Sequence, residues 1–136
     1  MKAKRLLPFV VALVIVAVVW VCFNPPGRFG WSCYAFTTYN VLPRFVTDLQ
    51  IRSDGAVRKV AKTHDVQFEL VEWLLESQPE VLIIAIGWDG VAQPEERIRA
   101  IPRTEVRVLK NLEAIRDFNR LKREGRRVSI HFHSTC

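Results

Sequence analysis

The clearest candidate for chemistry in the sequence is the turn Gly87-Trp88-Asp89-Gly90. It follows an apolar run, residues 81–86, that is rich in β-branched side chains and lacks helical periodicity, which predicts a strand buried on both faces. Open α/β sheets bind ligands at the carboxyl ends of such strands. Asp89 could therefore act as a general base or hold a polar ligand, with Trp88 as a stacking surface. The alternative is a tight turn whose glycines supply positive φ angles while Trp88 covers the core.

The C-terminal pattern His131-x-His133-x-x-Cys136 is a second candidate. Residues i and i+2 of a strand face the same side of a sheet, so both imidazoles could meet the thiolate and bind Zn²⁺ or Cu²⁺. A complete site needs a fourth ligand, and the sequence offers no obvious one. The alternative is a structural tail in which Cys136 is buried or free.

Other arrangements of nucleophiles are weaker. Ser129 or Ser134 could be drawn into a triad with His131 and Asp89, but no nucleophile-elbow motif supports it. The sequence thus identifies no catalytic residue and no cofactor. Three cysteines, Cys22, Cys33 and Cys136, are too few for a disulfide framework. Cys33 and Cys136 could pair if the domain faces an oxidising compartment.

The charge balance favours anionic surfaces without choosing among them. Lys and Arg number 20 against 14 Asp and Glu, a net charge of +6 over 136 residues. Six basic residues form one edge near the C-terminus: Arg116, Arg120, Lys122, Arg123, Arg126 and Arg127. They have no interleaved aromatics and no nucleic-acid motif, which argues against nucleic-acid binding. A solvated helix face is expected, with anionic lipid as the alternative if the domain is cytoplasmic.

The N-terminus predicts a membrane anchor. Lys2, Lys4 and Arg5 precede the uncharged segment Leu6–Phe23, which as a helix reaches about 27 Å, enough to cross a hydrocarbon core. No small-x-small cleavage site follows, which favours an uncleaved signal anchor over a signal peptide; lipid modification of Cys22 is a further alternative. The positive-inside rule places residues 1–5 in the cytoplasm and the domain outside.

The remaining chain divides into a tether and one domain. Residues 24–44 mix Pro, Gly and aromatics without a sustained period and are expected to be a linker. Within the domain, residues 45–136, a hairpin is expected around Ser53-Asp54-Gly55. A helix capped by Asp65 should run to residue 75. The central strand, a short helix opened by Pro94, and a strand over residues 105–109 should follow.

The last helix has the strongest sequence signature. Asn111 is expected to cap it, Leu112, Ile115, Phe118 and Leu121 to form its apolar stripe, and Gly125 to end it. A strand over residues 127–132 would close the domain. Strands alternating with helices imply parallel pairing, so the prediction is an α/β fold in three layers, with a mixed, mainly parallel sheet and an added N-terminal hairpin.

Several C-terminal motifs resemble those of the Mth-type domain family of unknown function. They are the strand ending at Gly87, the second strand Val106-Arg107-Val108-Leu109, the helix motif Phe118-Asn119-Arg120-Leu121, the segment Glu124-Gly125-Arg126-Arg127-Val128 and the ending Phe132-His133-Ser134-Thr135-Cys136. The family includes an adipogenesis-associated protein and a mitochondrial complex I assembly factor. The resemblance implies a compact three-layer α/β domain with no settled enzymatic activity. This chain differs in its Gly-Trp-Asp-Gly turn, where the family has a Gly-Thr-Gly-like one, and in its membrane anchor.

The sequence therefore predicts a single-pass membrane protein that displays a non-catalytic binding or assembly module. Its expected partners are the membrane, through residues 6–23, and another protein. One alternative is an enzyme or ligand-binding protein that uses the 87–90 turn and Asp89. Another is a thiol or metal protein that uses the C-terminal histidines and Cys136.

Overall fold

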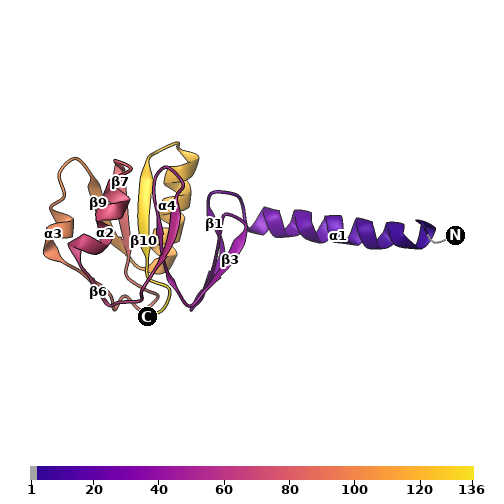
Figure 1. Ribbon diagram of the computed structural model, residues 1–136, viewed down its shortest axis with the longest axis horizontal. Coiled ribbons are helices and arrows are strands. Elements are labelled where there is room, and N and C mark those ends of the chain that lie inside the picture. The colour runs from indigo at the N-terminus through magenta and orange to yellow at the C-terminus, as the bar shows by residue number, and fades with distance from the viewer. Residues whose placement is uncertain (1–2) are drawn as a thin grey trace.

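The computed structural model describes residues 3–136 and shows a long helix that projects from a folded domain (Figure 1). The helix, α1 (Ala3–Phe23), contains the segment Leu6–Phe23, whose mean hydropathy is 3.0 and of which none is buried. By length and composition it can cross a membrane. Of the predicted cytoplasmic segment 1–5, residues 1 and 2 lie outside the described residues.

The domain is built on a mixed five-stranded sheet in the order β5-β4-β10-β7-β9. The strands are β4 (Asp48–Ile51), β5 (Val57–Val60), β7 (Val81–Ala85), β9 (Glu105–Leu109) and β10 (Val128–Phe132). Strands β10, β7 and β9 pair in parallel, while β4 and β5 form an antiparallel hairpin whose strand β4 pairs antiparallel with β10. The predicted fold class, an α/β domain with a mixed sheet and an N-terminal hairpin, is confirmed, although two of the four strand pairings are antiparallel.

Strand β7 separates two apolar cores. Its residues Val81, Ile83 and Ala85 pack in the core that contains helix α4 (Asn111–Arg123), and Leu82 and Ile84 pack with helices α2 (Phe68–Leu75) and α3 (Glu96–Arg99). All five side chains are fully buried. Alternate residues of a strand point to opposite faces, so helices cover both faces of the sheet and the domain has three layers.

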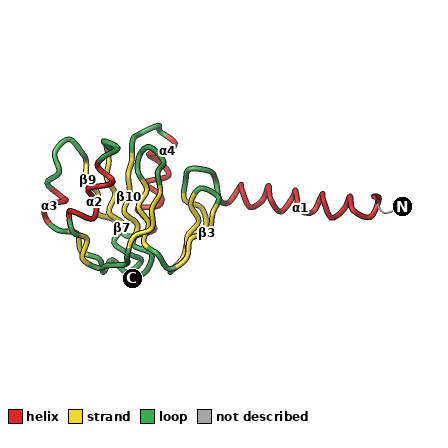
Figure 2. The backbone as a smooth tube through the Cα atoms, viewed as in Figure 1, coloured by secondary structure: helices red, strands yellow, loops and turns green. Residues whose placement is uncertain are grey.

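Residues 24–44 are not a tether, and this prediction is wrong. They carry strands β1 (Phe29–Cys33) and β2 (Phe36–Tyr39) and most of β3 (Leu42–Phe45), which form an antiparallel meander between α1 and the large sheet (Figure 2). The meander was missed because its turns lack the usual glycines. Ala35, Asn40 and Val41 adopt the positive φ angles that tight turns reserve for glycine.

The meander is joined to the large domain by aromatic packing. The Phe29 ring lies 5.2 Å from that of Phe118 on α4 and 5.1 Å from that of Phe132 on β10. Tyr39 packs in the same core. Aromatic contacts of this kind bury large apolar areas, so the domain core begins at Phe29 rather than near residue 45.

Two predicted helix starts are displaced. Asp65 does not cap α2: it lies in strand β6 (Asp65–Val66), which pairs in parallel with β8 (Gln93–Pro94). The N-cap is Gln67, whose side chain forms no capping hydrogen bond, and the Phe68 N–H donates to Glu95 Oε2 at 2.8 Å.

The start of α3 is displaced in the same way. Pro94 belongs to β8, and α3 begins at Glu96. In both cases pairing between distant segments overrides the local capping signal.

Helix α4 ends where predicted but starts one residue earlier. Lys110 is its N-cap and Asn111 is its first residue. Leu112 is exposed, and Ala114 joins Ile115, Phe118 and Leu121 in the buried stripe. Gly125, with a φ of 73°, ends the helix as predicted.

Candidate functional site

The Gly87 turn is closed by the C-terminal segment rather than open to a ligand. Gly87 has a φ of 97°, and a Cβ there would overlap the backbone carbonyl of Cys136. The Trp88 N–H donates to the Thr135 carbonyl at 2.8 Å, and the His133 N–H donates to the Ala85 carbonyl at 3.1 Å. The sheet edge at which α/β domains usually bind ligands is therefore occupied by residues 133–136.

Asn111 connects the turn to this segment. Its Oδ1 accepts a bond from the Gly87 N–H at 3.0 Å, and its Nδ2 donates to the His133 carbonyl at 2.7 Å. The residue is fully buried, so both bonds are shielded from water. Asn111 therefore positions two segments instead of capping the helix with its side chain.

Asp89 and Trp88 do not converge on one site. The Asp89 side chain is exposed and makes no hydrogen bond or ion pair with the part of the chain that is described. Trp88 is partly buried against the core that contains α4, as the turn interpretation predicts. Its indole Nε1 is buried without a partner among residues 3–136.

The C-terminal segment is held by a buried histidine–aspartate contact at the start of β4. His133 Nδ1 lies 2.8 Å from Asp48 Oδ2, and both side chains are fully buried. The other oxygen, Asp48 Oδ1, accepts bonds from the Ser134 N–H at 2.9 Å and from the Ser134 hydroxyl at 3.2 Å. Hydrogen bonds to a buried carboxylate are among the stronger ones in proteins, so Asp48 anchors the segment.

The structure brings together two of the three predicted metal candidates and adds a third. Cys136 Sγ lies 3.4 Å from His64 Nε2, and the His64 and His133 rings are 5.2 Å apart. One donor atom from each residue can be chosen so that all three lie within 4.8 Å. His64 lies just before β6, and no local sequence signal marks it. The Gln93 N–H donates to the His64 carbonyl at 2.7 Å and holds that loop.

His131 lies apart from this group. Its Nδ1 lies 3.2 Å from Gln50 Nε2. Burial of the imidazole lowers the pKa of His131 to about 4. His131 is therefore a neutral core residue at neutral pH.

The other predicted arrangements do not assemble. The Ser129 hydroxyl accepts a bond from the Ser53 N–H at 3.0 Å, Ser134 binds Asp48, and Asp89 faces solvent, so no triad forms with His131. Cys33 and Cys136 are both free thiols, and Cys136 contacts His64 instead.

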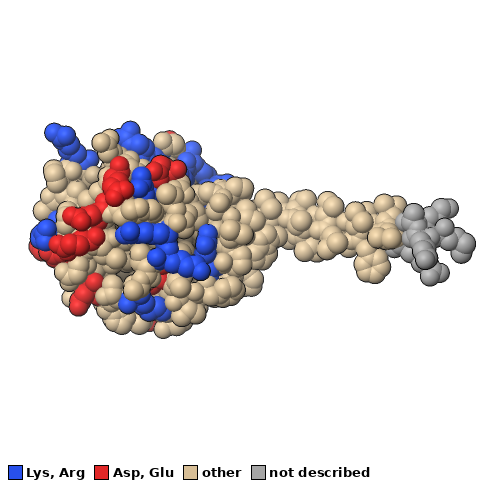
Figure 3. Space-filling view, in the orientation of Figure 1, with Lys and Arg blue, Asp and Glu red and all other residues tan. Residues whose placement is uncertain are grey.

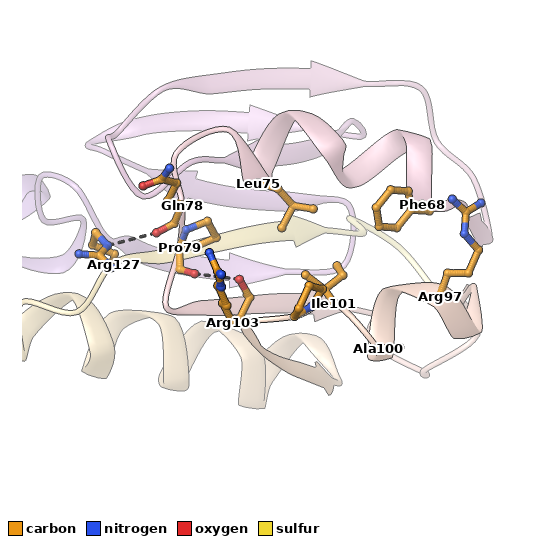
Figure 4. Close-up of a pocket in the computed structure, with 11 residues that line it drawn as sticks. Phe68, Leu75, Gln78, Pro79, Arg97, Ala100, Ile101, Arg103 and Arg127 are labelled. Atoms are coloured by element: carbon orange, nitrogen blue, oxygen red, sulfur yellow. Dashed lines mark hydrogen bonds between the residues drawn. The ribbon is translucent and has the colours of Figure 1, made fainter.

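A groove lies beside helix α2 (Figure 4), and helices α2 and α3 lie at the end of the domain away from α1 (Figure 1). It has a volume of about 690 Å³, within the range of ligand pockets. Its lining comes from α2, α3 and the segments that precede β7, β9 and β10: Phe68, Leu75, Gln78, Pro79, Arg97, Ala100, Ile101, Pro102, Arg103, Thr104 and Arg127.

The three arginines of the groove differ in their pairing. Arg97 forms ion pairs with Glu69 and Glu95 at 3.2 and 3.4 Å. Arg127 Nε donates to the Gln78 carbonyl at 3.1 Å. Arg103 forms no ion pair or hydrogen bond with the residues that the structure describes. It also has a φ of 62°, a strained angle for a residue other than glycine.

The basic edge is partly neutralised. Arg120 pairs with Asp117 on its own helix and with Glu124 at the helix end, and Arg126 Nε lies 3.6 Å from Glu80 Oε1. Arg127 belongs to the groove. This arrangement fits the solvated helix face expected from the sequence.

No protein-family model and no curated protein matches the chain, but several solved structures do. It is 28% identical to MT938, with a TM-score of 0.67 over 80% of this chain and 98% of that one. An outer membrane protein from Bartonella henselae is 19% identical, with a TM-score of 0.70 over 84% of this chain and 99% of that one. An Mth938-like domain from Bordetella pertussis is 16% identical, with a TM-score of 0.56 over 79% of this chain and 85% of that one.

The protein is thus a mixed α/β domain behind an apolar helix long enough to span a membrane. Its structural neighbours support the Mth-type domain family that the C-terminal motifs resemble. The function of these Mth938-like neighbours is unknown.

Proposed function

We propose that this protein is a membrane-anchored binding module whose groove beside α2 takes an acidic and apolar segment of another protein. The observation that carries the proposal is Arg103, which has no ion pair or hydrogen bond with any described residue. It lies at the edge of an apolar groove floor. Phe68, Leu75 and Ile101 supply that floor (Figure 4). An apolar anchor residue with a neighbouring carboxylate is the chemistry that fits both features.

The anchor is joined firmly to the domain. Trp20 Nε1 donates to the Val41 carbonyl at 3.0 Å, and Asn24 Oδ1 accepts a bond from the Trp31 N–H at 3.0 Å. Asn24 Nδ2 also donates to the Trp20 carbonyl at 3.0 Å. These bonds connect the last turn of α1 to the meander, so the helix continues directly into structured chain and the domain lies close to the membrane.

The meander is suited to the membrane interface. Trp31 is 65% exposed and Phe45 62% exposed, and aromatic side chains concentrate where lipid meets water. Charged side chains gather over the domain, whereas the part of α1 that is drawn in colour is uncharged (Figure 3). The groove lies on the other side of the domain, where a lipid of the same bilayer does not reach and a protein partner does.

The topology that we propose is an uncleaved signal anchor with the domain outside the cytoplasm. It rests on Lys2, Lys4 and Arg5 before the apolar segment, against Arg28 alone in the stretch that follows. External protease should remove a C-terminal tag from sealed cells. Protection of the tag would place the domain in the cytoplasm and reverse this topology.

A peptide-binding experiment tests the groove. The full chain in detergent micelles is titrated with fluorescent peptides that combine Leu or Phe with Asp and Glu, and with matched peptides carrying Asn and Gln instead. We expect binding of the acidic set only. Arg103→Glu should weaken it by at least about tenfold, because one charge-assisted bond contributes about 1.5–3 kcal/mol.

Arg116→Glu is the matched control, because Arg116 is exposed on α4, lies outside the groove and changes the net charge equally. Equal loss in both variants would show only a general charge effect. Equal binding of acidic and neutral peptides would contradict the proposal.

A further inference from the structure

We infer that His64, His133 and Cys136 form a binding site for a divalent transition metal of the zinc class. The site is independent of the groove, since none of the three residues lines it. It joins a loop before β6 to the segment after β10, and its residues His64 and Cys136 are 72 positions apart in the chain. A metal there would link the C-terminal segment to the rest of the domain.

The spacing of the donor atoms suits a single ion. Cys136 Sγ and His64 Nε2 are 3.4 Å apart, and donor atoms of all three residues lie within 4.8 Å of one another. Tetrahedral zinc with bonds of about 2.0–2.3 Å separates its ligands by about 3.5 Å. His64 is exposed, so a rotation of its side chain can close the remaining gap.

His133 has one ring nitrogen free to act as a ligand. Asp48 is an acceptor when ionised, so the 2.8 Å contact makes His133 Nδ1 the donor and leaves the lone pair of a neutral imidazole on Nε2. That atom is buried without a hydrogen-bond partner in the described chain. A buried acceptor left unpaired costs about 1–3 kcal/mol, and a metal ion would satisfy it. Carboxylate–histidine pairs commonly orient zinc ligands in this way.

Cys136 is held in place by the 87–90 turn, which the sequence analysis had predicted as a ligand site. The Thr135 carbonyl accepts a bond from the Trp88 N–H, and Gly87 leaves room for the Cys136 carbonyl. Cys136 is only partly buried and His64 is exposed, so the ion can enter from solvent. Two imidazoles and one thiolate would leave a fourth position for water, as in open zinc sites.

The experiment uses the full chain in detergent micelles. It is purified through an N-terminal tag without histidines, so that the tag neither binds metal nor lies beside Cys136. After chelation, the protein is titrated with Zn²⁺ by calorimetry and with Co²⁺ by absorption spectroscopy. We expect one equivalent of Zn²⁺ to bind. Co²⁺ should show a thiolate charge-transfer band, which only a sulfur ligand produces, and Zn²⁺ should displace it.

His64→Ala and Cys136→Ser should each weaken Zn²⁺ binding by at least about tenfold, and Cys136→Ser should remove the charge-transfer band. Both positions are accessible to solvent, and circular dichroism checks that the variants fold. Cys33→Ser is the matched control, because Cys33 is an exposed free thiol outside the cluster. Absence of the band in the unmodified chain, or equal loss in Cys33→Ser and Cys136→Ser, would overturn the assignment.

Discussion

Asn119 on helix α4 binds both backbone polar groups of Phe29 on strand β1. The Phe29 N–H donates to Asn119 Oδ1 at 2.9 Å, and Asn119 Nδ2 donates to the Phe29 carbonyl at 2.8 Å; the two residues are 90 positions apart in the chain. This pair gives a physical role to the asparagine of the Phe118-Asn119-Arg120-Leu121 motif: it fastens the meander, and with it the base of α1, to the domain.

Asn119→Ala should therefore loosen the meander. Loss of the amide leaves two backbone groups of a buried residue without partners, so we expect the free energy of unfolding to fall by about 1–3 kcal/mol. Denaturant unfolding in micelles measures this, and hydrogen exchange should rise in residues 29–45. Glu113→Ala, exposed on the same helix, is the control and should stay within about 0.5 kcal/mol. Unchanged exchange in the meander would show that aromatic packing alone holds it.

Gly87 and Gly55 form a matched pair for substitution. Their φ angles are 97° and 92°, but a Cβ at Gly55 meets nothing within 4 Å, whereas at Gly87 it overlaps the Cys136 backbone. Gly55→Ala should destabilise the fold by about 1–2 kcal/mol through backbone strain. Gly87→Ala should cost about 1–3 kcal/mol more, because the C-terminal segment must shift. Equal losses in thermal or denaturant unfolding would mean that this segment moves freely.

His131 should make stability depend on pH. Burial lowers its pKa from 6.5 to about 4, so between these values the unfolded chain binds the proton and the folded chain does not. The free energy of unfolding therefore has its full value above about pH 6.5. It falls as the pH drops toward 4, by about 3 kcal/mol in total.

Denaturant unfolding of metal-free protein at pH 7 and pH 4.5 measures this effect. His131→Phe should flatten the difference, because it removes the titrating group. His64→Ala, at an exposed imidazole, should leave the difference unchanged. A pH dependence that persists in His131→Phe would assign it to other groups; the titratable neighbours of the imidazole are Asp48, His133 and Arg58.

Asp89→Asn should have no effect on stability or on peptide binding. The side chain is exposed and lies outside the groove, so we expect a change within about 0.5 kcal/mol. The measurements are unfolding in micelles and the peptide titration described above. If cellular function were lost while fold and binding stayed intact, chemistry at the 87–90 turn would be favoured instead.

Local sequence patterns were enough to predict several elements of the fold. The apolar run of residues 81–86 predicted β7, the alternation of residues 105–109 predicted β9, and the stripe through Phe118 and Leu121 predicted α4 with its end at Gly125. Each signal lies within one element, because burial on one or both faces imposes a period of two or 3.6 residues. The apolar segment Leu6–Phe23 is the same kind of signal.

Contacts between residues far apart in the chain became visible only in the folded domain. The meander depends on Asn119 and Phe118, far along the chain, and its turns use residues other than glycine. The sequence predicted Asn111 as a helix cap, yet its side-chain amide forms hydrogen bonds with Gly87 and His133. His64 contacts Cys136, which is 72 positions away in the chain. Arg103 lines a groove that is formed by the packing of α2 and α3. Such contacts leave no periodic trace in the sequence, because they depend on the path of the whole chain and not on the conformation of one segment.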